Sequence, residues 1–173
     1  MTTKHATAGG PVGATASHRE RVTIERMYVA SIDDVWAMWT TKDGIESWWG
    51  PDGYTVTVRT IDVRVGGVLD YTMRATGEGQ IEFMKKAGMP LAVDCRLTYT
   101  EVTPPTRLGY SHYADFIPGV EPYLVNHTVE LRATTGGVRL TLTIDRMHDD
   151  YWTEMAVKGW ENELEKLAKA LAA

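Results

Sequence analysis

Two histidines and a tyrosine fall on the apolar faces of neighbouring segments that alternate like β-strands. Tyr110 and His112 share one face of the segment 107–113, and His127 lies on the apolar face of the segment 123–133, because strand side chains alternate with a period of two. A buried polar group without a hydrogen-bond partner costs about 1–3 kcal/mol. The three side chains therefore either hydrogen-bond internally or orient a ligand in a cavity, and we favour the cavity.

Aromatic and methionine side chains are frequent enough to form the walls of such a cavity. The chain has six tryptophans and eight methionines, and methionine offers adaptable apolar surface. Gly159 precedes Trp160 in a helical segment, where glycine costs about 1 kcal/mol relative to alanine. We expect this glycine to permit close approach of the sheet or of a ligand. The predicted ligand-binding residues are Tyr110, His112, His127, Trp160, Met155, Met73, Trp49, Phe83 and Tyr123.

The common catalytic and cofactor motifs are missing from the sequence. It contains no GxGxxG, Walker A, GxSxG, HExxH or CxxC pattern, and its histidine spacings define no metal site. We therefore predict no catalytic residue, metal or cofactor. The alternative is an enzyme that uses the same pocket for cyclisation, dehydration or hydrolysis. His112 or His127 would then act as general acid or base, with Tyr110 as a proton donor.

Length and composition fit one globular domain. The chain has 173 residues, 43% apolar and 24% charged, and a net charge of −5 without a basic patch, which excludes nucleic acid as an expected partner. No apolar run is long enough for a signal peptide or a membrane span. Cys95 is the single cysteine, so no internal disulfide can form, and we expect a cytoplasmic protein. An exposed sheet edge would allow a homodimer.

The pattern along the chain predicts a flexible tail over residues 1–18 and one domain over residues 19–173. A strand over 21–29 precedes two short helices, the first capped by Ser31. Six more strands and a long helix follow. The segment 77–90 does not alternate, and its centre, 80–87, would form either a helical turn or a mobile flap. The remaining ranges are helices to about 40, over 42–48 and from about 149 to 171, and strands over 55–63, 68–75, 92–102, 107–113, 123–133 and 138–146.

This order of elements predicts an α+β fold. Runs of strands closed by a helix favour a seven-stranded antiparallel sheet that curls around the long C-terminal helix. The apolar stripe of that helix is formed by Trp152, Met155, Ala156, Trp160, Leu164, Leu167 and Leu171. The charged residues expected off the stripe are Glu161, Glu163, Glu165, Lys166 and Lys169.

Six short motifs follow one another between residues 22 and 171. They are Arg26 with Ala30-Ser31 and Val35-Trp36; Trp48-Trp49-Gly50-Pro51; Asp62-Val63-Arg64-Val65-Gly66-Gly67; Glu101-Val102 with Pro104-Pro105 and Arg107-Leu108; Gly136-Gly137-Val138-Arg139-Leu140; and Gly159-Trp160 with Leu164 and Leu167. In this order they resemble the Hsp90 ATPase activator homologue (AHSA1-like) family of the START and Bet v 1-like (SRPBCC) superfamily.

The resemblance implies a helix-grip fold, with a cavity between the sheet and the C-terminal helix. Related domains bind lipids, hormones or polyketides, and some act as cyclases or dehydratases, but no universal catalytic residue transfers to this chain. The segment 78–90 would form a lid. We therefore expect binding of an apolar or aromatic small molecule, and we weigh a chaperone-interaction module as a further alternative. The family's founder has an additional N-terminal domain that a short tail does not supply, so we do not expect Hsp90 as a partner.

Overall fold

The computed structural model describes residues 20–173, so the tail expected over residues 1–18 lies outside the described residues. Over these residues the chain forms seven strands and four helices, in the predicted order apart from α3, for which the sequence left two alternatives. They are β1 (Arg21–Tyr28), α1 (Ile32–Thr40), α2 (Lys42–Trp48), β2 (Tyr54–Ile61), β3 (Val68–Ala75), α3 (Glu78–Lys86), β4 (Ala92–Thr103), β5 (Arg107–Ala114), β6 (Tyr123–Thr134), β7 (Gly137–Asp145) and α4 (Asp150–Ala172).

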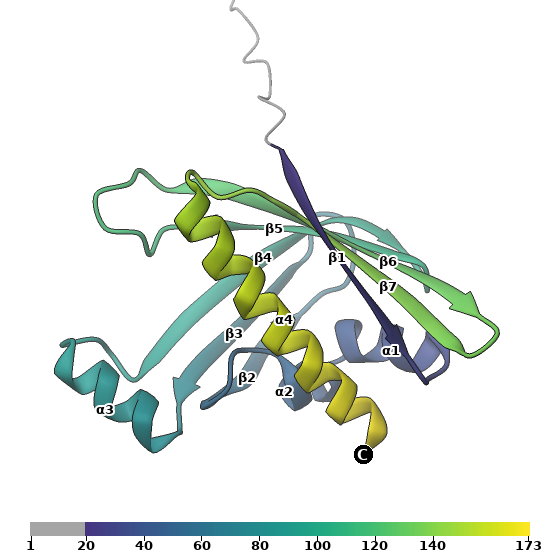
Figure 1. The fold of residues 1–173 in the computed structure, drawn as a ribbon, viewed down its shortest axis with the longest axis horizontal. Helices are drawn as coiled ribbons and strands as arrows, with labels where there is room; N and C mark the ends of the chain where they lie inside the picture. Colours follow the sequence, from purple (N-terminus) through teal and green to yellow (C-terminus); the bar gives the residue numbers. More distant parts are fainter. Residues whose placement is uncertain (1–19) are drawn as a thin grey trace, which may run out of the picture.

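The seven strands form one antiparallel sheet in the order β1-β7-β6-β5-β4-β3-β2. The register shifts between Val58 and Thr60 on β2 and between Tyr99 and Glu101 on β4. Such irregularities bend a strand and increase its twist. The result is a curved sheet with α4 lying diagonally across it (Figure 1). The predicted α+β fold, a curved sheet around a long C-terminal helix, is confirmed.

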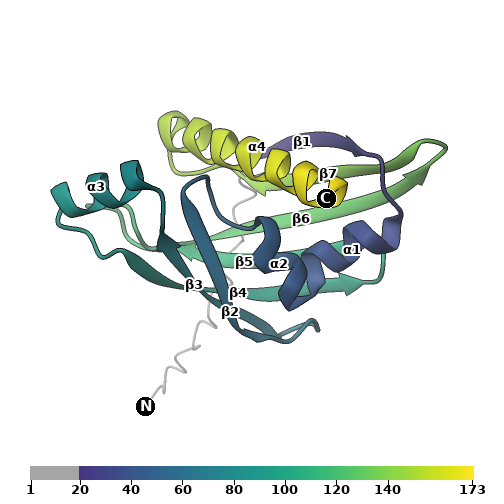
Figure 2. The same cartoon turned by 90° about the horizontal axis from the view of Figure 1, so that it is seen from below.

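Helices α1, α2 and α4 lie on the same side of the sheet (Figure 2). The hydroxyl of Ser31 accepts the Asp34 backbone N–H at 3.1 Å and caps α1 as predicted. Asp149 caps α4 by accepting the Trp152 backbone N–H at 2.8 Å. Capping satisfies N–H groups that a helix start leaves free.

Two apolar clusters lie along the inner face of the sheet. The main cluster gathers around the C-terminal half of α4, where Leu164 and Leu167 are fully buried. Tyr28 of β1 ties α4 to the sheet by donating its hydroxyl to the Leu164 carbonyl at 3.0 Å. The second cluster lies at the N-terminal half of α4 and comprises Ala114, Ile117 and Val125 with Val120, Tyr123, Met147 and Trp152.

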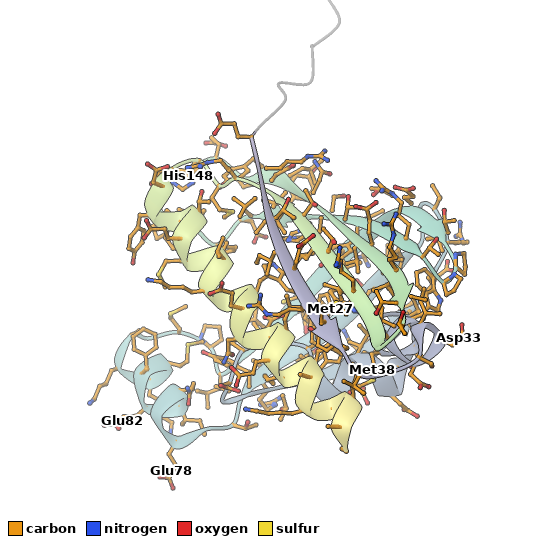
Figure 3. All side chains as sticks on the ribbon, turned by 45° about the vertical axis from the view of Figure 1, so that its right-hand side comes forward. Met27, Asp33, Met38, Glu78, Glu82 and His148 are labelled. Atoms are coloured by element: carbon orange, nitrogen blue, oxygen red, sulfur yellow. The ribbon has the colours of Figure 1, made fainter. Side chains whose placement is uncertain are left out.

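The segment 77–90 contains a regular helix, α3, so the helical alternative is confirmed. The helix is anchored at its start, because the backbone N–H groups of Thr76 and Gly77 donate to the Gly53 carbonyl at 2.8 and 2.9 Å. Met84 is the buried residue of this helix. Glu78 and Glu82 project away from the rest of the molecule (Figure 3). No helix within residues 20–173 is long and apolar enough to cross a membrane.

Packing of α4 onto the sheet predicts a large effect for one core truncation. Leu164→Ala removes a side chain that is fully buried in the main cluster. We expect the free energy of unfolding, measured by urea denaturation, to fall by about 2–5 kcal/mol. Glu165→Ala is the control, because the neighbouring Glu165 is exposed. Equal stability of the two variants would contradict the role of this contact.

Candidate ligand-binding site

Tyr110 and His127 form the centre of the site. They are cross-strand partners on β5 and β6, and their rings stack at 4.8 Å between centroids with 7° between planes. Both residues are buried, with 2% and 4% of their surface exposed. The Tyr110 hydroxyl nevertheless has no hydrogen-bond partner. The His127 Nδ1 also has none, although the Val125 backbone forms a hydrogen bond with this imidazole that raises its pKa. Buried polar atoms are almost always hydrogen-bonded, so the unpaired phenol needs an explanation.

His112 extends this pair along β5, with its ring centroid 5.0 Å from that of His127. Burial lowers the pKa of His112, and the nearby Asp115 carboxylate partly offsets this effect. Burial also lowers the pKa of His127, and His112 lowers it further. Both imidazoles are therefore neutral at pH 7. A neutral imidazole offers one hydrogen-bond donor and one acceptor.

Two tryptophans form walls next to the stacked pair. The Trp160 ring of α4 lies 5.5 Å from the His127 ring, and the Trp49 ring lies 6.1 Å from the Tyr110 ring. The two indoles meet edge to face at 5.5 Å and 84°. Five of the predicted residues, Tyr110, His112, His127, Trp49 and Trp160, are thus brought together in one cluster.

Glu163 is half-buried, although it belongs to the charged residues expected mostly off the apolar stripe of α4. The Gly50 backbone N–H donates to its carboxylate, and burial raises its pKa to about 7, although Lys166 and this hydrogen bond both lower it. Lys166 itself points inward to the loop between α2 and β2, where its ammonium donates to the Gly50 carbonyl at 2.6 Å. These loop contacts position an acid and a cation on the sheet-facing side of the helix.

Tyr71 and Cys95 add two further polar groups that sequence reasoning missed. They are cross-strand partners on β3 and β4. The Trp49 indole N–H donates to the Tyr71 hydroxyl, and that hydroxyl donates to the Cys95 thiol. Burial raises the pKa of both the phenol and the thiol, so both groups are neutral. The sequence could have indicated Tyr71, because this residue lies on the same face of the predicted strand 68–75 as Leu69 and Met73.

The site lies between the two apolar clusters. Along β5, Tyr110 belongs to the main cluster and Ala114 to the second, with His112 between them. Along α4, Trp160 belongs to the main cluster and Trp152 to the second. Gly159 lies between these two tryptophans in the sequence, and a Cβ built there meets no atom within 4 Å. The sheet therefore does not approach this glycine closely, and the alternative, close approach of a ligand, stays a prediction.

The remaining predicted residues are spread around this centre. Met73 packs partly buried against the main cluster, next to Gly50. Met155 and Phe83 are 45% and 65% exposed, on α4 and α3. Tyr123 lies in the second cluster, with its hydroxyl 3.0 Å from Nδ1 of His148. These three do not join the five-residue cluster.

Two surface hollows lie elsewhere, and none of the nine predicted residues lines them. One, of ≈ 510 Å³, lies beside α4 between Arg146 and Glu161. The other, of ≈ 620 Å³, is lined by Arg107, Glu130 and neighbouring residues. Within residues 20–173, no three His, Cys, Asp or Glu side chains gather in a way that would hold a metal ion.

Comparisons with solved structures show the same fold in several bacterial proteins. A protein of Chromobacterium violaceum is similar with a TM-score of 0.72 and 22% identity, covering 88% of this chain and 97% of that one. An AHSA1-like protein of Aeromonas hydrophila has a TM-score of 0.66 and 24% identity, covering 88% and 92%. An AHSA1 protein of Silicibacter pomeroyi has a TM-score of 0.68 and 20% identity, covering 88% and 98%.

No curated protein matches the sequence. A family model does match it, over residues 29–172, and its description is "Activator of Hsp90 ATPase homolog 1-like protein". The match includes the two short helices, six of the seven strands and α4. The chain therefore belongs to the family of Activator of Hsp90 ATPase homolog 1-like proteins.

Proposed function

We propose that the protein binds a small molecule with an apolar or aromatic body on the inner face of the sheet, between the two apolar clusters. The observation that carries the proposal is the Tyr110 hydroxyl, which is buried without a partner in a ring that stacks on the His127 imidazole. A ligand with a polar end would supply the missing hydrogen bond. Each unsatisfied group otherwise costs about 1–3 kcal/mol.

The surroundings of the pair suit such a ligand. Trp49 and Trp160 offer large apolar surfaces, and ligand pockets typically combine aromatic walls with a few placed polar groups. Access is available from the N-terminal half of α4, where Gly159 faces open space and Met155 is 45% exposed.

A second candidate function, catalysis in the same site, is favoured by Glu163. General bases work best when their pKa lies near the operating pH, and burial raises the pKa of Glu163 to about 7. Its carboxylate also raises the pKa of Tyr110, which places the two groups in one environment. Together they offer a base and a proton donor for an enolisable substrate. A metabolite turnover screen separates catalysis from binding, because only catalysis requires turnover that Glu163→Gln abolishes.

Ligand entry beside Gly159 predicts a size-dependent effect at this position. We expect saturable binding of the neutral fluorescent probe N-phenyl-1-naphthylamine, measured by its fluorescence increase. Gly159→Leu fills the open space and should weaken binding by about tenfold or more, equivalent to at least about 1.4 kcal/mol.

Gly159→Ala is the matched control for that experiment. It places only a Cβ in the opening, so probe binding should persist, and the helix should gain about 1 kcal/mol of stability. Unchanged affinity in Gly159→Leu would contradict entry at this place. Absence of probe binding in the wild type, together with no co-purified small molecule in native mass spectrometry, would contradict the proposed function.

Burial of Glu163 also predicts a pH dependence of stability. Its pKa is raised from 4.5 to about 7 on folding, so the folded state holds a proton that the unfolded state releases across this range. Stability is therefore lost as pH rises from about 4.5 to 7, by an amount on the order of 3 kcal/mol. The lowered pKa values of His112 and His127 act in the opposite direction, because they make stability rise with pH below about 6.5.

A comparison of Glu163→Gln with the wild type tests how ionisation of the Glu163 carboxyl group affects stability. Glu163→Gln should gain stability relative to the wild type between pH 5 and pH 8 in urea unfolding, because the amide cannot ionise. Glu165→Gln removes an exposed carboxylate of the same helix and should show no such trend. A constant difference between the wild type and Glu163→Gln across this range would contradict a buried, proton-holding Glu163.

A further inference from the structure

Two arginines lie directly opposite each other on the outer face of the sheet. Arg132 of β6 and Arg139 of β7 are cross-strand partners, close to the turn of the hairpin that projects at the right of Figure 1. Both side chains are exposed, whereas the adjacent Leu131 and Leu140 are buried in the main cluster on the inner face. Directly opposed side chains have Cβ atoms about 4.5–5.5 Å apart, and like charges in such a pair are destabilising.

Neither of these two guanidiniums forms an ion pair with a carboxylate of residues 20–173. The other cross-strand neighbour of Arg139 is Met27, which carries no charge. The acid nearest to Arg132 on the same face of β6 is Glu130, and its carboxylate is paired with Arg107. An anion bound between the two arginines would offset their repulsion.

The arginine pair lines the surface hollow of ≈ 620 Å³. Arg107 lines it as well, and its guanidinium is held by Glu101 at 2.8 Å and by Glu130. Thr141 adds a hydroxyl, which can donate or accept a hydrogen bond. Glu25 lies opposite Thr141 on β1 and is the second carboxylate of the lining. The lining thus has three guanidiniums and two carboxylates, a net charge of +1 in a chain of net charge −5.

We propose that this hollow binds an oxyanion, a carboxylate or phosphate group, between Arg132 and Arg139. A guanidinium is a planar fork that donates two parallel hydrogen bonds to a group of this kind, and two opposed forks can donate to one anion. Glu25 repels the same anion, so the site favours a small anion of low charge. The hollow lies on the outer face of β6 and β7, so this proposal is separate from ligand binding on the inner face.

Inorganic phosphate and succinate test the proposal, with sodium chloride at equal ionic strength as the reference for screening. The melting temperature of the full chain should rise saturably with at least one of the two anions, because a ligand of the folded state stabilises it. The anion that acts identifies the group that the hollow accepts. Arg132→Gln and Arg139→Gln should each weaken its binding by about tenfold or more. Arg74→Gln is the matched control, because Arg74 is an exposed arginine of β3 that does not line the hollow.

Removal of the acid should have the opposite effect. Glu25→Gln takes a carboxylate out of the lining, so the anion should bind about twofold to fivefold more tightly than to the wild type. In dilute chloride, Arg132→Gln and Arg139→Gln should melt at a higher temperature than the wild type, because each removes the repulsion between the two arginines. The proposal is overturned if neither anion raises the melting temperature beyond chloride, or if Arg74→Gln weakens binding as much as the two hollow variants do.

Discussion

The long helix α4 covers the inner face of a seven-stranded sheet together with α1 and α2, and apolar packing along α4 is uneven. The C-terminal half of α4 contributes Leu164 and Leu167 to the main cluster. Both side chains are fully buried against the sheet and the tryptophans of α1 and α2. The N-terminal half packs Trp152 into a second, smaller cluster. Between the residues of the two clusters the helix has Gly159, which contributes no side chain.

The loop between α2 and β2 joins the parts of the molecule that surround the site. Gly50 donates its N–H to Glu163, and its carbonyl accepts a hydrogen bond from the Lys166 ammonium, so one residue of the loop binds two charged side chains of α4. Asp52 is bound by Asn162, whose amide donates to its carboxylate at 2.8 Å. Gly53 anchors the start of α3 through its carbonyl. Hydrogen bonds to charged groups are among the stronger polar contacts, so this loop couples the helix, the site and α3.

Sequence reasoning predicted the fold and the inward direction of two candidate site residues because strand alternation is a local property. Tyr110 and His127 face inward, as their period-two neighbours required, and the register makes them partners. The same rule predicts that Tyr71 faces inward, because Tyr71 lies on the same face of β3 as Leu69 and Met73. Glu163 was missed for a different reason: charge predicts exposure on average, and only the tertiary contact with Gly50 overrides that average.

The sequence pattern also could not predict which face of α3 packs against the sheet. A short helix can bury either of two adjacent apolar residues, and here Met84 is buried at 5% exposure whereas Phe83 remains 65% exposed. Which of them faces the sheet depends on how the preceding turn is anchored to Gly53, and that anchor joins residues 23 and 24 positions apart. Non-local contacts of this kind decide side-chain placement without leaving a periodic signal in the sequence.

The fold itself constrains function only weakly, because one architecture supports many unrelated sites. The compared structures share this architecture at 20–24% identity. The proposed binding function therefore depends on side chains of the inner face rather than on the fold. Apolar rings alone would accept many guests, since apolar contact is non-directional. A buried polar group without a partner, the Tyr110 hydroxyl, gives the proposed site the direction that the rings lack.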